Sequence, residues 1–293
     1  MDTYYKASGK FAPSSIIYLL LISITALPIL GLIYAYAAWY IPLPYINFLI
    51  TAGFGFLIGL LVNFIIKKGK VRNSMIALIF GLLAGIIGLY FHWAVWVDLV
   101  INAGESYGNS RIGVTVSNIK ILDVFILAAN PVQLFELIGE INQYGTWGIK
   151  GMVPTGTLLY VLWAVELLIV VVISSMLPFI RAKQPFCEKS VAWFEEKELT
   201  PLSFIAEPNT MKTSLENKET NIFDTITLAE NVEGDHSIFT LYSSKHNENY
   251  ISIENKKAKL DDKGKLDFDN NLFVEYISID ATLKEALISK SKI

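Results

Sequence analysis

The chain has 293 residues, of which 53% are hydrophobic, and a formal net charge of −3 at pH 7. Its mean hydropathy is +0.45, and its apolar share exceeds the roughly 45–50% of ordinary soluble domains. The acidic balance argues against nucleic acid as a partner, because nucleic-acid binding requires a basic face. A single cysteine, Cys187, excludes an internal disulfide.

The composition changes near residue 185. Residues 1–180 contain nine basic and seven acidic residues, whereas the remaining residues contain fifteen and twenty. We therefore expect residues 1–185 to form a membrane part, with the lipid bilayer as its environment, and residues 186–293 to form a soluble domain. The predicted fold class is an α-helical integral membrane protein of four transmembrane helices with a small C-terminal α+β cytoplasmic domain.

Four apolar runs are long enough to cross a bilayer, which requires about 20 residues. They are residues 15–40, 44–66, 75–99 and 156–180. The first run exceeds the roughly 7–15 residues of a signal-peptide core, so we expect an uncleaved helix, with a cleaved signal peptide as the alternative. Pro28 in this run either kinks the helix or is tolerated within the bundle.

Basic residues near the helix ends set the orientation of a membrane protein. The basic residues that flank the four runs all fall on one side: Lys6, Lys10, Lys67, Lys68, Lys70, Arg72, Arg181 and Lys183. The connection between the first two runs has no charge, and residues 100–154 carry three basic residues over their whole length. We therefore predict that both termini are cytoplasmic and that residues 100–154 are extracytoplasmic.

Residues 121–145 are apolar enough to suggest a fifth span. Asp123, the pair Asn130-Pro131, Glu136 and Glu140 interrupt this stretch, and a fifth span would move the basic residues after the last run to the outside. The apolar residues after Pro131 fall mostly on one helical stripe. This pattern predicts an amphipathic helix on the outer surface or, as the alternative, a helix buried in a small extracytoplasmic cap.

Small residues allow helices in lipid to approach closely. They recur on one face of the second and third runs, as Ala52, Gly55 and Gly59 and as Gly81, Gly85 and Gly88. These two helices are consecutive and antiparallel, so Gly59 should lie level with Gly81 and Gly55 with Gly85. We predict a tight seam between these two helices, and the alternative is that glycine is simply common in membrane helices.

Glu166 lies inside LWAVELLIVVV, residues 162–172. The fifteen Leu, Ile, Val and Phe residues of residues 157–180 favour insertion by about 5–9 kcal/mol, and an ionisable residue opposes it by about 3 kcal/mol. Insertion of this helix is therefore favoured. Glu166 should face the bundle, protonated and hydrogen-bonded, because none of the runs contains a Lys or Arg to pair with it. We predict His92 as its partner, directly or through a water. The pair either fixes two helices together or forms a proton or ion site.

The C-terminal part shows shorter patterns. We expect a surface helix at residues 188–199 and loop or flexible linker at about 200–235, with a short helix near 211–218. Alternation predicts strands at 237–244 and 248–255, a second hairpin around the turn at 261–264, and a further strand at 272–279. Asp280 is placed to cap a last helix.

The chain contains no Walker loop, GxSxG or HExxH motif, and its histidines lack zinc spacing. We therefore expect no catalytic residues, no metal and no cofactor. The leading hypothesis is a non-enzymatic membrane scaffold or complex subunit whose residues 186–293 bind a protein partner. The alternative is a proton- or ion-linked transporter or channel subunit that uses Glu166 and His92, and it would require a homo-oligomer or a widened bundle. An intramembrane enzyme is disfavoured, because it would usually need several convergent polar groups.

Overall fold

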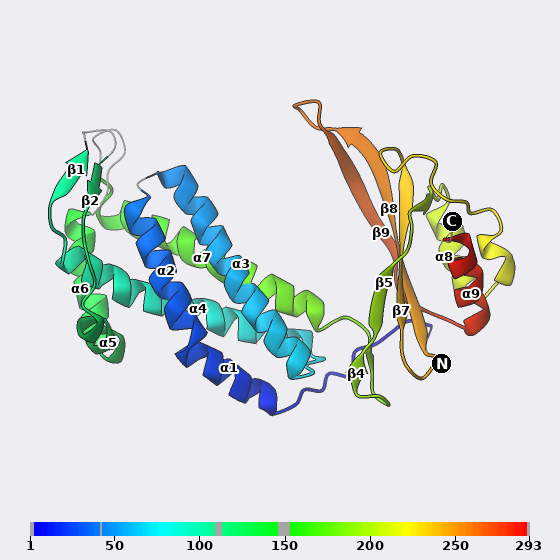
Figure 1. Cartoon of the computed structure of the whole chain (residues 1–293), viewed down its shortest axis with the longest axis horizontal. Coiled ribbons are helices and arrows are strands. Elements are labelled where there is room, and N and C mark those ends of the chain that lie inside the picture. The colour runs from blue at the N-terminus through cyan, green and yellow to red at the C-terminus, as the bar shows by residue number, and fades with distance from the viewer. Residues whose placement is uncertain (1–2, 42, 109–112, 146–152, 292–293) are drawn as a thin grey trace. The chain divides into compact units, whose positions relative to one another are not determined.

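The computed structural model describes residues 3–41, 43–108, 113–145 and 153–291. These residues form two compact units. The helical unit is Gly9–Lys183, and the sheet unit joins Met1–Ser8 to Gln184–Ile293. Both are shown in Figure 1.

Within the described residues, the helical unit has four helices long and apolar enough to cross a membrane. They are the broken helix α1–α2 (Ser14–Ile24 and Ala26–Tyr40), α3 (Pro44–Lys68), α4 (Ser74–Ile101) and α7 (Gly156–Arg181). This confirms the four apolar helices that the sequence predicts. We call the end that carries Tyr40, Pro44, Ile101 and Gly156 the far end, and the opposite end the tether end.

The first long helix is interrupted at Thr25, whose φ is −121° and ψ −73°. The cause is Pro28, because a proline ring lacks an N–H and clashes with the carbonyl four residues earlier, here that of Ile24. The Thr25 hydroxyl donates a hydrogen bond to the Leu21 carbonyl at 2.6 Å. The helix is thus broken at one residue near Pro28, while Ser14–Tyr40 remains a single candidate span.

The segment between α4 and α7 contains a short antiparallel strand pair, β1 (Ser106–Gly108) and β2 (Gly113–Thr115). Two helices follow, α5 (Ile121–Ala129) and α6 (Pro131–Tyr144), at an angle of 107°. On α6, Leu134 and Ile138 are buried, whereas Val132 and Phe135 are more than 60% exposed. The helix predicted after Pro131 is present, with one apolar side packed in the helical unit and the other uncovered.

The sheet unit, as far as it is described, contains a five-stranded antiparallel sheet. Its main order is β5 (Glu195–Glu198), β7 (His236–Ser243), β8 (Asn249–Leu260) and β9 (Leu266–Ile279), and β6 (Leu202–Ser203) also pairs with β7. A small hairpin, β3 (Phe186–Cys187) and β4 (Ala192–Trp193), precedes it. The hairpins predicted around residues 244–248 and 261–264 are confirmed.

Helices α8 (Pro208–Glu216) and α9 (Ala281–Lys290) lie beside the sheet in Figure 1, together with the 3-10 turn η1 (Thr220–Phe223). Their apolar side chains share one core with Phe239 and Ile251 of the sheet. The predicted cap of α9 is confirmed, because Asp280 Oδ1 accepts a hydrogen bond from the Leu283 N–H at 2.9 Å. The short helix predicted near 211–218 is α8, which starts three residues earlier.

Two expectations for the start of this unit are corrected. Residues 188–199 form no helix; they form β4 and β5, because Glu195–Glu198 pairs with β7 and tertiary pairing overrides local helix propensity. The segment 200–235, expected as a loop or flexible linker, contributes six apolar side chains to the core. These are Leu202, Ile205, Met211, Leu215, Phe223 and Ile226.

The N-terminal segment belongs to the sheet unit. The Tyr5 N–H donates to the Tyr276 carbonyl at 2.9 Å, and the Ser278 N–H donates to the Thr3 carbonyl at 2.8 Å. Tyr4 and Ile277 form the antiparallel bridge between them. The segments before α1 and after α7 therefore fold into one unit, which the sequence pattern did not predict.

Candidate functional site

Four helices bring polar side chains together around Glu166. Glu166 lies on α7, Tyr34 on α2, Thr51 on α3 and His92 on α4. At about 1.5 Å per helical residue, Glu166 is about 15 Å from the start of α7 at the far end. Tyr34 and Thr51 are each about 10 Å from the far end of their own helices, so the cluster lies in the far half of the unit.

A chain of short contacts runs through this cluster. The Tyr34 hydroxyl is 2.5 Å from Glu166 Oε1 and 2.7 Å from the Thr51 hydroxyl. The Thr51 hydroxyl in turn donates to the Asn47 carbonyl at 2.8 Å. One hydrogen-bonded path therefore connects the carboxyl on α7 through α2 to the backbone of α3.

His92 borders this path. Its Nε2 lies 3.7 Å from Glu166 Oε1, beyond the roughly 3.2 Å limit of a good hydrogen bond. The imidazole centroid is 4.3 Å from the Tyr34 ring centroid at a tilt of 37°. Its Nδ1 is buried, and no hydrogen-bond partner for it is found among the described residues. The structure thus places His92 beside Glu166, as predicted. The side chain at hydrogen-bonding distance from the Glu166 carboxyl is Tyr34 instead of His92.

The cluster is shielded by the surrounding helices. Tyr34, Thr51 and His92 are at most 5% exposed, and the Glu166 side chain is 20% exposed. Phe54 stacks on the Tyr34 ring at a centroid distance of 4.4 Å. Glu166 therefore faces the other helices, which is the orientation predicted for an intramembrane carboxyl.

Sequence reasoning missed Tyr34, although a signal for it exists. The buried residues of α2 include Leu27, Gly31, Tyr34 and Ala35, a helical stripe. Gly31 lies against α4 at His92, since a Cβ on Gly31 would be 2.8 Å from the backbone nitrogen of His92. A glycine one turn before a tyrosine on this stripe marks the position where α2 brings the Tyr34 ring against His92.

The predicted glycine seam is corrected. A Cβ on Gly55 would be 3.1 Å from Val170 Cα, and a Cβ on Gly59 would be 3.3 Å from the Ile173 carbonyl oxygen, both on α7. The glycines of α4 face α7 as well, because a Cβ on Gly81 would lie 2.5 Å from Ser175 Cα. Gly55 and Gly59 of α3 and Gly81 of α4 therefore pack against α7 rather than against each other.

The remaining seam residues fit this arrangement in part. A Cβ on Gly85 would be 2.7 Å from Ser174 Oγ of α7, whereas one on Gly88 would be 2.7 Å from Ile58 Cδ1 of α3. Ala52 is half-buried. A small-residue stripe identifies the face of a helix that is approached closely, but it does not identify the helix that approaches it.

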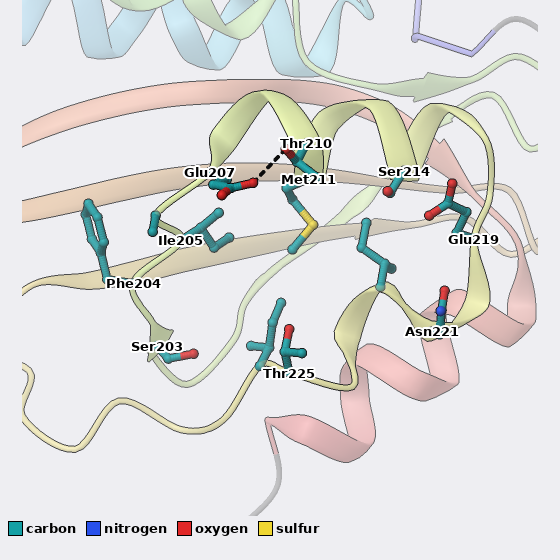
Figure 2. Close-up of a pocket in the computed structure, with 13 residues that line it drawn as sticks. Ser203, Phe204, Ile205, Glu207, Thr210, Met211, Ser214, Glu219, Asn221 and Thr225 are labelled. Carbon is teal, nitrogen blue, oxygen red and sulfur yellow. Dashed lines mark hydrogen bonds between the residues drawn. The ribbon is translucent and has the colours of Figure 1, made fainter.

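The sheet unit has a second candidate site. A pocket of about 350 Å3 lies between the loop after β6, helix α8 and η1, and Figure 2 shows Met211 pointing into it from α8. Two acidic side chains, Glu207 and Glu219, lie at its wall, and Thr210 donates a hydrogen bond to Glu207 at 2.9 Å. Its lining is mixed apolar and acidic without a basic side chain.

Comparisons of the chain with protein-family models, with curated proteins and with solved structures gave no match. In the described part of the chain, no group of three or more His, Cys, Asp or Glu side chains is arranged to hold a metal ion. The interpretation of function therefore depends on the geometry of the two units.

Proposed function

We propose that the chain is a non-enzymatic, four-span membrane protein that presents its sheet unit to a protein partner. The observation that carries this proposal is the pairing of Thr3–Tyr5 with β9. One folded domain contains both segments that flank the helical unit. The helical unit is thus inserted into the sequence of the sheet unit at one point, between Ser8 and Gln184.

This arrangement favours an even number of membrane crossings. A folded domain lies on one side of a bilayer, and the chain leaves it before Ser14 and returns to it after Arg181. Four crossings satisfy this condition and five do not. The bent pair α5–α6 accordingly packs against the far end of the bundle without completing a crossing, and its Leu127, Leu134 and Ile138 share a cluster with Trp96 and Leu99 of α4.

The basic loop between α3 and α4 supports a cytoplasmic sheet unit. The Arg72 N–H donates to the Lys10 carbonyl at 2.8 Å, and the Ala12 N–H donates to the Gly69 carbonyl at 3.2 Å. Lys67 and Lys68 in the last turn of α3, and Lys70 in the loop that follows, therefore lie at the tether end, next to the segment that leads to the sheet unit. Basic loops are retained on the cytoplasmic side, so the tether end and both termini are cytoplasmic.

The outer part of the β8–β9 hairpin is the candidate contact surface for the partner. In Figure 1 this hairpin extends beyond helices α8 and α9. Leu260 is 71% exposed and Leu272 is 51% exposed. Both leucines lie away from Tyr276–Ser278, where the N-terminal segment pairs with β9. Exposed leucines on a protruding hairpin, next to a part of the β9 edge that has no strand partner among the described residues, are suited to contact with another protein.

The test is purification of the full chain in mild detergent, with hairpin and control variants. We expect a stoichiometric protein partner with the natural chain and with Val232→Ser, which removes a 56% exposed side chain outside the hairpin. The double variant Leu260→Ser, Leu272→Ser should lose the partner while keeping its melting temperature. Purification of the natural chain alone, or full retention of the partner by the double variant, would contradict the proposal.

A further inference from the structure

We propose that α5 enters the hydrocarbon of the membrane leaflet at the far end of the helical unit and contacts lipid acyl chains through its exposed apolar stripe. This proposal rests on the four-span placement proposed above and is independent of the protein partner of the sheet unit. Three observations carry it: the hydrogen bonds between α5 and α4, the pairing of the backbone where α5 ends, and the side chains that α5 leaves uncovered.

Two hydrogen bonds attach the two ends of α5 to α4. Asp98 Oδ2 accepts from the Lys120 N–H at 2.8 Å just before α5, and the Tyr90 hydroxyl donates to the Ala128 carbonyl at 2.8 Å near its last residue. The two bonds are eight residues apart on each helix, and the residue numbers rise along α5 as they fall along α4. Helix α5 therefore runs alongside α4 from the far end back toward the tether end, over about 12 Å.

The depth that α5 reaches follows from the length of α4. Helix α4 begins at Ser74, at the tether end where α3 ends in Lys67 and Lys68. A hydrocarbon core of about 30 Å corresponds to about 20 helical residues, so its far boundary lies at about residue 94 of α4. Asp98 lies beyond this boundary, whereas Tyr90 lies about 6 Å inside it. The first turn of α5 is therefore at the membrane surface, and its last turn is within the hydrocarbon.

The backbone at the end of α5 is paired as hydrocarbon requires. A helix end leaves carbonyls without partners inside the helix, and such groups are costly in lipid, where no water replaces the missing donor. The Asn130 side chain donates to the Ile126 carbonyl at 3.0 Å, and the Asn130 N–H donates to the Leu127 carbonyl at 3.1 Å. Tyr90 pairs the next carbonyl, that of Ala128. Three successive carbonyls are thus satisfied by protein groups.

The side of α5 that faces away from the bundle is apolar. Its exposed residues are Ile121, Leu122, Phe125, Ile126 and Ala129. They recur at spacings of one, three, one and three, which places them on one helical stripe. Leu122 is 77% exposed and Phe125 is 65% exposed. The charged residue of α5, Asp123, is in the first turn, so the deeper part of the stripe carries no charge.

This stripe continues the uncovered surface of α4. The exposed residues of α4 at its tether side are Met75, Ile79, Leu83 and Ile86, at spacings of four, four and three. Tyr90 is four residues after Ile86 and contacts both α5, through the Ala128 carbonyl, and α6, through the Phe135 ring at a centroid distance of 6.5 Å. Between Ile86 and Ile101 no residue of α4 is exposed. At the depth of Tyr90 the outer surface is therefore that of α5, and acyl chains that cover α4 meet α5 next.

Fluorescence quenching in lipid vesicles tests this proposal. The full chain, with its buried thiol removed by Cys187→Ala, carries one label at Phe125→Cys in phosphatidylcholine vesicles. Phosphatidylcholine brominated on its acyl chains quenches a label in the hydrocarbon, and iodide on both sides of the membrane quenches a label in water. We expect the Phe125→Cys label to be quenched by the brominated lipid several-fold more than a label on the sheet unit, and by iodide several-fold less.

Two control labels calibrate the two quenchers. Leu83→Cys, on the exposed stripe of α4, marks lipid, and Val232→Cys, 56% exposed in the sheet unit, marks water. Leu122→Cys is a second label position on the α5 stripe if Phe125→Cys fails to fold. Lipid quenching of an α5 label at a level close to that of Leu83→Cys supports the proposal.

Two results at the α5 labels would overturn it. Quenching by iodide, with the brominated lipid without effect, would place α5 in water. Insensitivity to both quenchers would show that protein, such as a second copy of this chain, covers the stripe. Either result leaves the four-span proposal in place while Leu83→Cys is quenched by the brominated lipid. Quenching of Leu83→Cys by iodide alone would overturn the four-span proposal and this one together.

Discussion

The two units of this chain place their apolar side chains in opposite ways. In the helical unit, large apolar residues such as Leu20, Ile24, Leu49 and Leu168 are at least 60% exposed. In the sheet unit, Leu215, Phe239 and Ile251 are at most 1% exposed. An uncovered apolar surface of this extent suits lipid, whereas a closed apolar core suits water.

The same contrast extends to what holds each unit together. Helices in lipid gain little from burying apolar surface against one another, so close backbone approach and hydrogen bonds matter more. In the helical unit, Gly81 and Gly85 allow α7 to approach α4 closely, and Ser174 Oγ donates a hydrogen bond to the Gly81 carbonyl at 3.0 Å. The sheet unit depends on apolar burial between segments that are far apart in sequence. Variants should therefore damage the two units by different routes.

The largest expected effect is from Gly81→Leu. A Cβ at Gly81 would lie 2.5 Å from Ser175 Cα and 2.6 Å from the Ser174 carbonyl oxygen. Both are backbone atoms of α7, so the helices must separate to accommodate a side chain, at a cost of about 3 kcal/mol or more. We expect loss of the monodisperse peak in fluorescence-detected size-exclusion chromatography. The control Gly53→Leu meets no atom within 4 Å and should keep the peak.

Equal damage from Gly53→Leu and Gly81→Leu would contradict the close-contact account of the helical unit. It would mean that any added side chain on these helices is harmful, whatever it touches. Survival of both variants would place α7 away from the glycine faces. Either result would remove the contrast between the two units.

The next effect in size concerns Leu215→Ala in the sheet unit. Leu215 lies on α8 and is fully buried in the core with Phe239 and Ile251. Truncating a buried leucine costs about 2–5 kcal/mol. Leu272→Ala, at a position 51% exposed, should change the free energy of unfolding by less than about 0.5 kcal/mol. Chemical denaturation followed by tyrosine fluorescence measures both, and equal costs would show that α8 does not belong to the core.

The sequence predicts the helical unit better than the sheet unit because its signal is local. A run of about 20 apolar residues identifies a helix by itself, and Pro28 locates a break within it. The partner of a helix face is not local information. The spacing of Gly55 and Gly59 indicates a face that is closely approached, but α7, more than 100 residues later, is what approaches it.

The errors in the sheet unit have the same origin. Glu195–Glu198 is charged throughout and looks like a surface helix, yet it becomes β5 because residues 240–243 of β7 provide its hydrogen bonds. The segment Thr3–Tyr5 carries no signal of its own, and its position is set by β9.

At the candidate site, Glu166 and His92 could be identified because polar residues are rare in apolar runs. The sequence does not single out Tyr34 in this way, because tyrosine is common at membrane interfaces.

A smaller effect concerns the two helix caps, one in each unit. The Asn73 side chain accepts hydrogen bonds from the N–H groups of Met75 and Ile76 at the start of α4, and Asp280 caps α9 in the same way. If both caps are in contact with water, Asn73→Ala and Asp280→Ala should each cost about 1 kcal/mol. Asn73→Asp keeps the acceptor and should cost less than Asn73→Ala. Thermal unfolding measures all three.

A much larger cost for Asn73→Ala than for Asp280→Ala would break this part of the comparison. Unsatisfied backbone N–H groups cost several kcal/mol in the hydrocarbon region, where water is absent. Such a difference would mean that the start of α4 lies within lipid. The basic loop before it would then not mark the membrane surface, and the assigned boundary of the helical unit would need to move.

The smallest expected effect is a pH dependence at Tyr4, whose position is set by the pairing of the N-terminal segment with β9. Burial, together with the hydrogen bond that the Tyr4 hydroxyl donates to Glu216, raises the pKa of Tyr4 from 10.0 to about 12. A raised pKa means that the folded state favours the neutral phenol, so this contribution to stability is complete below pH 10 and is lost as the pH rises toward 12.

Tyr4→Phe has no proton to lose, so its stability should fall less steeply than that of the natural chain over this interval. The measurement is denaturant unfolding at several pH values between 9 and 12. Tyr18→Phe, in α1 of the helical unit, is the control, because it removes a tyrosine hydroxyl and leaves the hydrogen bond between Tyr4 and Glu216 in place. Identical slopes for Tyr4→Phe and the natural chain would show that Tyr4 is not held against Glu216, and that the N-terminal segment is not a stable part of the sheet unit.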